Sequence, residues 1–127
     1  MYLDNSLIFS EEQAVTATAD ATNDLDLLAA GDADMWLEVM VDTAFESATA
    51  KASVTFALST SAAADFATSE VLWSSGAVEH ENLTAGKTFK VKLPAGVQRY
   101  LRMSYTVSTT MTAGKVNAYL VWDVQRN

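Results

Sequence analysis

Cysteine is missing from all 127 residues of the chain, and histidine and proline occur only once each, as His80 and Pro94. Disulfide bonds, thiolate nucleophiles and cysteine-based zinc sites are therefore excluded. No serine lies in a Gly-x-Ser-x-Gly sequence, and one histidine allows at most one catalytic triad. The glycines stand singly, so no glycine-rich phosphate loop is present. We therefore expect a protein that is not an enzyme and has no cofactor.

Long hydrophobic runs are also missing. No apolar stretch approaches the roughly 20 residues that a membrane-spanning helix needs. The first residues lack the basic and apolar regions of a secretory signal. We expect a soluble protein that stays where it is made and that has no membrane partner.

Positive charge is absent before Lys51, and all eight basic residues follow from there, against a formal net charge of −8. A protein that binds nucleic acid normally carries a concentrated positive patch. Nucleic acid is therefore not an expected partner. The acidity is explained equally by solubility or by a partner that recognises negative charge, and both explanations stay open.

What the chain does contain is a series of short segments with the alternation typical of β-strands. Residues 100–107 and 116–124 alternate most regularly, and we expect them to pair as a β-hairpin. Residues 35–41 are almost continuously apolar, which predicts a central strand buried on both faces, although Trp36 could instead serve a partner. Further strands are expected at residues 6–9, 13–17, 25–28, 53–59, 70–74 and 87–93.

The segments between these strands complete the prediction. We expect a turn at residues 10–12, a strand end at 75–76, and Val71 and Trp73 on one face of the strand at 70–74. Residues 59–68 should form a long loop over Phe66, and the polar residues 108–114 a contact loop. About eight to ten short strands in one domain predict an all-β sandwich or barrel.

His80 lies between two glutamates at residues 79–81, an arrangement that resembles a metal or acid–base cluster. In a strand, however, the glutamates share one face and His80 points to the other, so a solvated strand end is the favoured interpretation. The acid pairs at residues 24–26 and 32–34 offer the oxygens that calcium prefers. Neither has the glycine and terminal glutamate of an EF-hand loop, so ordinary surface acids are favoured and no metal site is expected.

The two ends of the chain resemble a known family. Residues 1–16 read MYLDNSLIFSEEQAVT, and residues 100–105 and 114–125 read YLRMSY and GKVNAYLVWDVQ. In these segments the chain resembles the capsid cement, or decoration, proteins of short-tailed double-stranded DNA phages, of the Bordetella phage kind. The likeness runs along nearly the whole chain and is clearest at its ends.

The resemblance implies a jelly-roll β-sandwich, made in the host cytoplasm, that binds the outer surface of an icosahedral phage shell. Such a protein bridges adjacent subunits of the phage major capsid protein and stabilises the head against DNA pressure. It implies a homo-oligomer, with a dimer favoured and a trimer possible, and no catalytic residues. We expect a single jelly-roll domain over residues 1–127 with an N-terminal arm of residues 1–9.

Two sets of contact residues follow from this expectation. The capsid contacts are predicted on the arm and on the loops at 59–68 and 108–114, at Tyr2, Leu3, Leu7, Phe9, Phe66, Thr110 and Met111. The oligomer contacts are predicted at Tyr100, Arg102, Tyr119 and Val121.

One alternative function stays open at this point. A carbohydrate-binding β-sandwich module of a phage fibre or adhesin would have the same fold class, with Trp36, Trp73 and Tyr100 as candidate sugar-binding residues. A jelly-roll enzyme of the cupin type would need several histidine ligands, and the chain has one.

Overall fold

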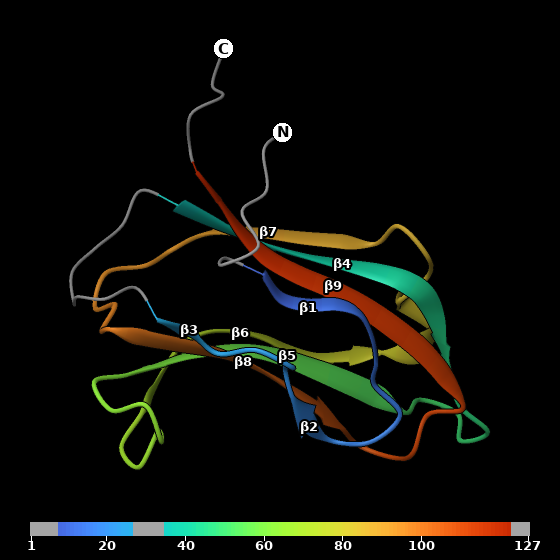
Figure 1. Ribbon diagram of the computed structural model, residues 1–127. Coiled ribbons are helices and arrows are strands. Elements are labelled where there is room, and N and C mark those ends of the chain that lie inside the picture. Colours follow the sequence, from blue (N-terminus) through green and yellow to red (C-terminus); the bar gives the residue numbers. More distant parts are fainter. Residues whose placement is uncertain (1–7, 27–34, 123–127) are drawn as a thin grey trace.

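The computed structural model describes residues 8–26 and 35–122, which form two antiparallel β-sheets packed face to face (Figure 1). The strands are β1 (Ile8–Ala14), β2 (Ala19–Asp20), β3 (Leu25–Asp26), β4 (Met35–Glu46), β5 (Ser53–Ser61), β6 (Glu70–Glu79), β7 (Thr88–Lys92), β8 (Tyr100–Val107) and β9 (Ala113–Trp122). In the described ranges the one helical segment is the 3-10 turn η2 (His80–Asn82), and no helix there could cross a bilayer. The prediction of an all-β sandwich is confirmed.

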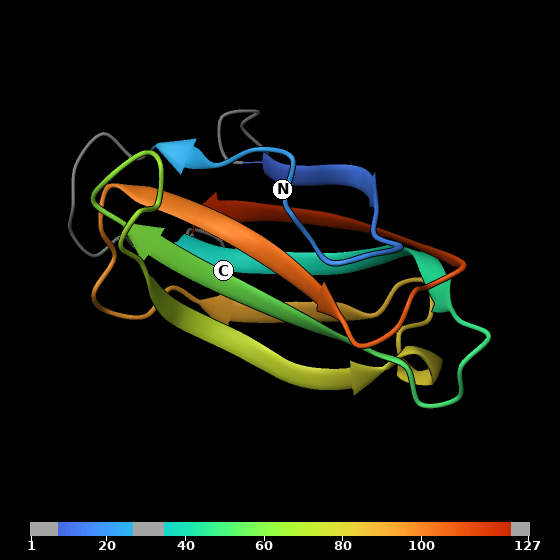
Figure 2. The ribbon, with the colours of Figure 1, turned by 90° about the horizontal axis from the view of Figure 1, so that it is seen from below.

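The strand order identifies the sandwich as a jelly roll. Sheet A has the order β1-β9-β4-β7 and sheet B the order β2-β8-β5-β6, with β3 also paired to β8. The chain thus folds like one long hairpin in which β1 lies beside β9, β2 and β3 beside β8, β4 beside β7, and β5 beside β6. Pairing of β9 with β4 and of β8 with β5 rolls this hairpin into two sheets. Figure 2 shows β8, β5 and β6 of sheet B side by side.

The prediction that residues 100–107 and 116–124 pair as a hairpin is wrong. Both segments are strands, but β8 lies in sheet B and β9 in sheet A. The residues between them cross from one sheet to the other at one end of the sandwich (Figure 1). Alternation reveals a strand and its inward face, whereas it contains no information about which strand lies alongside.

Two expected chain breaks are bulges inside continuous strands. Strand β1 passes through residues 10–12, where Glu12 has a φ of 50° and the register with β9 shifts. Strand β6 likewise continues through Gly76, which has a φ of 71° beside a register shift with β5. A bulge inserts an extra residue without ending a strand. A second register shift in β6 lies between Val71 and Trp73. Val71 is 65% exposed, whereas Trp73 packs against the core. The expectation that these two side chains share one face is therefore also wrong.

Strand β4 was correctly predicted as a central strand, although its outward face is only partly buried, and the strand expected at residues 87–93 is β7. Strand β4 lies between β9 and β7, and its first seven residues are buried or partly buried, although the strand continues to Glu46. Beside it, Phe89 and Val91 of β7 pack against the core, and Leu93 just after the strand is buried. Strand β4 therefore carries side chains into the core on one face and presents a second face outward.

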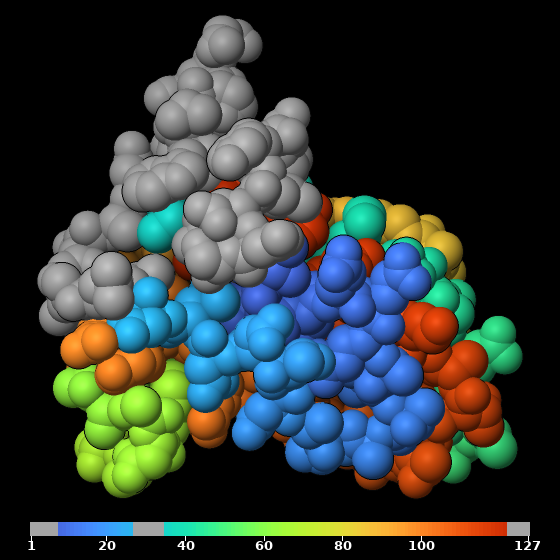
Figure 3. Space-filling view, viewed as in Figure 1, coloured from blue at the N-terminus to red at the C-terminus, as the bar shows by residue number. Residues whose placement is uncertain are grey.

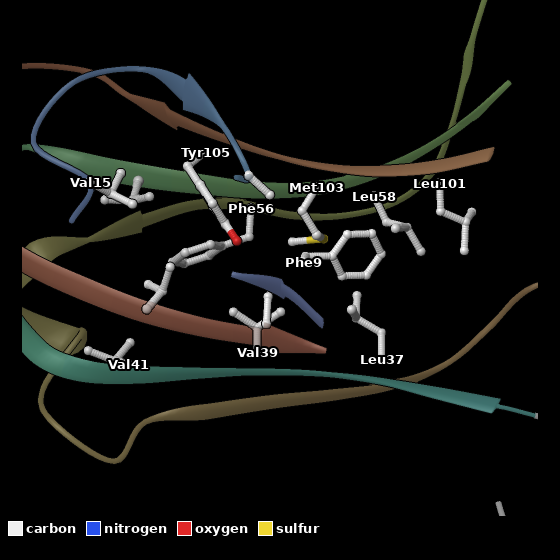
Figure 4. Packing of buried hydrophobic residues seen from close by; sticks show 14 of the residues in the cluster. Phe9, Val15, Leu37, Val39, Val41, Phe56, Leu58, Leu101, Met103 and Tyr105 are labelled. Carbon is white, nitrogen blue, oxygen red and sulfur yellow. The ribbon is translucent and has the colours of Figure 1, made fainter. Parts of the chain in front are cut away.

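The core fills the space between the sheets (Figure 4). Its largest fully buried side chains include Phe9, Leu37, Val39, Phe56, Leu58, Leu101, Met103 and Tyr105. The Phe56 ring lies at the centre of an aromatic cluster, 5.4 Å from Phe89, 5.8 Å from Tyr105 and 6.4 Å from Phe45 between ring centroids. Aromatic rings bury large apolar areas in defined geometries. This cluster therefore joins the two sheets rigidly.

A chain of hydrogen bonds fastens the N-terminal strand to the opposite sheet. The Tyr105 hydroxyl lies 2.7 Å from Ser10 Oγ, which donates to Gln13 Oε1 at 2.6 Å. Gln13 Oε1 also accepts from the Thr22 backbone N–H at 2.9 Å, and Gln13 Nε2 donates to the Asp20 carbonyl at 3.0 Å. The network ties β1 to β8 and to the β2–β3 segment. This N-terminal part of the chain, blue in Figure 3, covers one side of the sandwich.

Because the Tyr105 hydroxyl is buried, we expect the stability of the protein to change at high pH. Burial raises the pKa of Tyr105 to about 12, an effect that the hydrogen bond to Ser10 only partly opposes. A tyrosine in the unfolded chain ionises near about 10. Between these values the folded chain keeps a proton that the unfolded chain has lost, so stability is complete below pH of about 10 and falls as the pH rises towards about 12.

We expect the free energy of unfolding to fall by about 2–3 kcal/mol across this window because of Tyr105. In Tyr105→Phe this part of the decline should be absent, and the variant should be about 1–2 kcal/mol less stable at pH 7 because the bond to Ser10 is lost. Urea unfolding of both proteins between pH 7 and pH 12 measures the difference. Equal pH dependence in the two proteins would contradict the expectation.

Candidate functional site

The outer surface of sheet A is a regular array of side chains from three neighbouring strands, which we call the sheet A face. It consists of Val121, Tyr119 and Asn117 on β9, Trp36, Glu38 and Met40 on β4, and Lys92, Lys90 and Thr88 on β7. These side chains point outward because the alternate residues, such as Leu37, Val39 and Leu120, are buried in the core. Trp36, Met40, Tyr119 and Val121 are only partly exposed. The face is therefore broad and largely apolar over β4 and β9.

Glu38 occupies the middle of this face. It lies directly opposite Tyr119 on one side and Lys90 on the other, and only 6% of it is exposed. Lys90 Nζ is 3.5 Å from Oε2 of Glu38. The pKa of Tyr119 is raised, by burial first and then by the charge of Glu38 and a hydrogen bond to it. Oε1 of Glu38 has no hydrogen-bond partner in the described part of the chain.

The outer surface of sheet B has a different character. Its two central strands present the opposed pairs Arg102 and Ser59, Ser104 and Ala57, and Thr106 and Thr55. Apart from Arg102 these side chains are small, and all but Ala57 are polar. Protein interfaces are enriched in aromatic residues and methionine and depleted in serine and alanine. The sheet A face therefore matches the composition of an interface, whereas the centre of sheet B does not.

An arginine cluster holds the short strands β2 and β3 against β8. The Arg102 guanidinium donates two hydrogen bonds of 2.9 Å to the Asp24 carboxylate, lies 3.7 Å from Asp20, and stacks 4.2 Å from the Phe66 ring centroid. Arg99 donates to the Asp26 carboxylate at 2.7 and 3.0 Å. Paired hydrogen bonds of this type fix both position and orientation. The carboxylates of Asp20, Asp24 and Asp26 therefore form ion pairs with arginines.

Of the remaining metal candidates, the structure describes residues 79–81. His80 begins the 3-10 turn after β6 and is partly exposed. Residues 32–34 are outside the described residues. Among the residues that the structure describes, no three histidine, aspartate or glutamate side chains are grouped so that they could hold a metal ion.

Most of the predicted capsid-contact residues are either buried or outside the described residues. Tyr2, Leu3 and Leu7 lie outside the described residues. Phe9 and Met111 are buried core residues, at 0% and 1% exposure, so their side chains are not on the surface. Ile8 and Phe9 of the expected arm belong to β1, which is a paired strand of sheet A, and this explains the burial of Phe9.

Two predicted capsid-contact residues remain on the surface. Phe66 is partly exposed beneath Arg102 and has a φ of 53°, and its backbone N–H donates to the Ala63 carbonyl at 3.1 Å. Such a backbone is uncommon for a bulky residue, so the loop at residues 62–69 holds this ring in a defined place. Thr110 is exposed, and its carbonyl accepts a hydrogen bond from Ser47 Oγ at 2.9 Å.

The predicted oligomer-contact residues lie on two different surfaces. Tyr119 and Val121 belong to the sheet A face, whereas Tyr100 and Arg102 are in β8 of sheet B. They cannot form one continuous patch. The three candidate sugar-binding residues are divided in the same way, with Trp36 in sheet A and both Trp73 and Tyr100 in sheet B.

Sequence reasoning missed Glu38. The available signal was a single acid within the apolar run Met-Trp-Leu-Glu-Val-Met-Val at residues 35–41. A charge in the middle of a central strand is unusual, since glutamate is almost never buried unless it is paired.

These features define a jelly-roll β-sandwich protein with one largely apolar face suited to contact with another protein. The family model of Bbp16 matches residues 9–120, and the chain belongs to this Bordetella phage protein family. A comparison with curated proteins finds no match.

Proposed function

We propose that the chain is a capsid cement protein, which binds the outer surface of an icosahedral phage shell and bridges adjacent subunits of the major capsid protein. The observation that carries this proposal is the match to a Bordetella phage family over most of the chain. The sheet A face supports it, because a structural protein of a phage particle acts through a contact surface of this kind. In this proposal the chain acts as a dimer and works by binding, without a catalytic step.

The proposed mechanism is mechanical. The core and the polar network around Ser10 join both sheets, so the sandwich deforms little when force acts across it. A standard protein contact buries about 1,600 Å², and nanomolar affinity corresponds to about 12 kcal/mol. Once one shell subunit is bound, the second contact forms at a raised effective concentration. Repeated over many copies, such contacts oppose the outward pressure of packaged DNA.

Binding to purified shells tests this function. The chain is added to expanded phage shells that lack it, and the bound fraction is measured by co-sedimentation. We expect saturable binding, together with a higher disruption temperature of the decorated shells in calorimetry, because each bound copy stabilises the assembled state by mass action. Shells of an unrelated phage serve as the control. If the chain stays in the supernatant with its own expanded shells, the cement function is contradicted.

A further inference from the structure

The contacts of Glu38 with Lys90 and Tyr119 account for only part of its burial. The residue is 6% exposed. Its Oε2 lies 3.5 Å from Nζ of Lys90, whose side chain is 56% exposed, and its carboxylate is hydrogen-bonded to Tyr119. Oε1 has no hydrogen-bond partner in the described residues. Leaving a buried charged oxygen unpaired is costly, and groups of this kind in native proteins call for a specific reason.

We propose that the sheet A face docks onto a partner protein and that Oε1 of Glu38 accepts hydrogen bonds from an arginine or lysine side chain of that partner. The inference rests on the proposed function, in which the partner is the major capsid protein. Trp36, Met40, Tyr119 and Val121 are the neighbours of Glu38 on this face of β4 and β9. When a partner covers these side chains, water is excluded and the ion pair becomes stronger than it would be on an open surface.

The charges favour a different protein over a second copy of this chain. The lysines of the face already have partners, because Lys90 contacts Glu38 and Lys92 Nζ lies 5.8 Å from the Trp36 ring centroid. A two-fold contact centred on Glu38 would bring two carboxylates together, which is unfavourable. The net charge of −8 also attracts a basic partner surface.

Glu38→Gln separates a binding role from a structural one. The amide keeps the shape of the side chain and removes its charge. We expect the affinity for expanded shells to fall about thirty-fold or more, since the partner's basic group is left buried without its counter-charge. The melting temperature of the free chain should stay the same or rise, because a buried charge has been removed. A purely structural role predicts the reverse, with a lower melting temperature and unchanged affinity.

A second pair of variants tests the face without touching Glu38. Val121→Arg places a charged side chain on the sheet A face, and Thr106→Arg makes the matched change on the outer surface of sheet B. Val121→Arg should reduce shell binding at least tenfold, because a desolvated charge opposes the contact. Thr106→Arg should bind like the unmodified chain.

The outcomes are distinguishable. If the unmodified chain fails to bind expanded shells, the cement function and this inference both fall. If it binds but Glu38→Gln binds equally well, the inference is overturned while the cement function stands. If Glu38→Gln leaves shell binding intact and changes the mass measured by light scattering, the face contacts a second copy, and the inference is overturned as well.

Discussion

Replacing Phe56 with alanine is expected to lower the free energy of unfolding by about 3–5 kcal/mol. Phe56 is fully buried, and its ring lies within 6.4 Å of three other aromatic rings that come from both sheets. The substitution leaves a cavity at the point where the sheets are joined. Since a domain of this kind is stable by about 5–15 kcal/mol, the loss would be a large part of the total.

Phe56→Leu is the matched control, because it keeps much of the volume and should cost about 1.5 kcal/mol or less. Unfolding in guanidinium chloride at pH 7 measures both variants. If Phe56→Ala were no less stable than Phe56→Leu, the ring cluster could not have the central role that its position indicates.

Replacing Gly114 with alanine should cost about 2–5 kcal/mol. The φ of Gly114 is 148°, a conformation that side chains rarely adopt, and an added Cβ would lie 2.6 Å from Cε2 and 2.7 Å from Cγ of Phe45. Phe45 is itself a buried member of the core, so its ring has little room to move. Thermal or chemical unfolding should show a marked loss of stability.

Gly76→Ala is the control for backbone strain alone. Gly76 has a φ of 71°, and an added Cβ there would meet nothing within 4 Å, so its cost should be limited to about 1–2 kcal/mol. In a Phe45→Leu background the extra cost of Gly114→Ala should shrink, because the flat ring is gone. Equal losses for the two glycine variants would show that contact with Phe45 does not matter.

Most strands could be predicted because alternation depends on neighbouring residues. Leu101, Met103 and Tyr105 are buried as their spacing in β8 indicates, and the same is true of Val116, Ala118 and Leu120 in β9. The errors occurred where a local pattern has two structural outcomes. Residues 10–12 and Gly76 have the composition of turns, but in both places β-bulges accommodate the extra residue and pairing with the neighbouring strand continues.

The candidate contact residues were harder to predict than the strands. Tyr119 and Val121 were predicted as oligomer contacts because both faces of their segment are apolar, and the structure places both on the sheet A face. Phe9 and Met111 were misassigned because a large apolar residue near a chain end or in a loop has the same sequence signal whether it faces a partner or the core. Their burial depends on β1 pairing with β9 and on the packing of the second sheet.

The sequence by itself determined the fold class, the absence of cysteine chemistry and the inward face of most strands, because these follow from composition and from contacts between near neighbours. Only the tertiary structure decided that β8 and β9 lie in opposite sheets and that β1 pairs with β9, where Ile8 lies opposite Tyr119. It also placed Glu38 between Tyr119 and Lys90 on one face. Such arrangements depend on contacts between residues far apart in the chain, which are formed cooperatively in the folded core and leave no local pattern in the sequence.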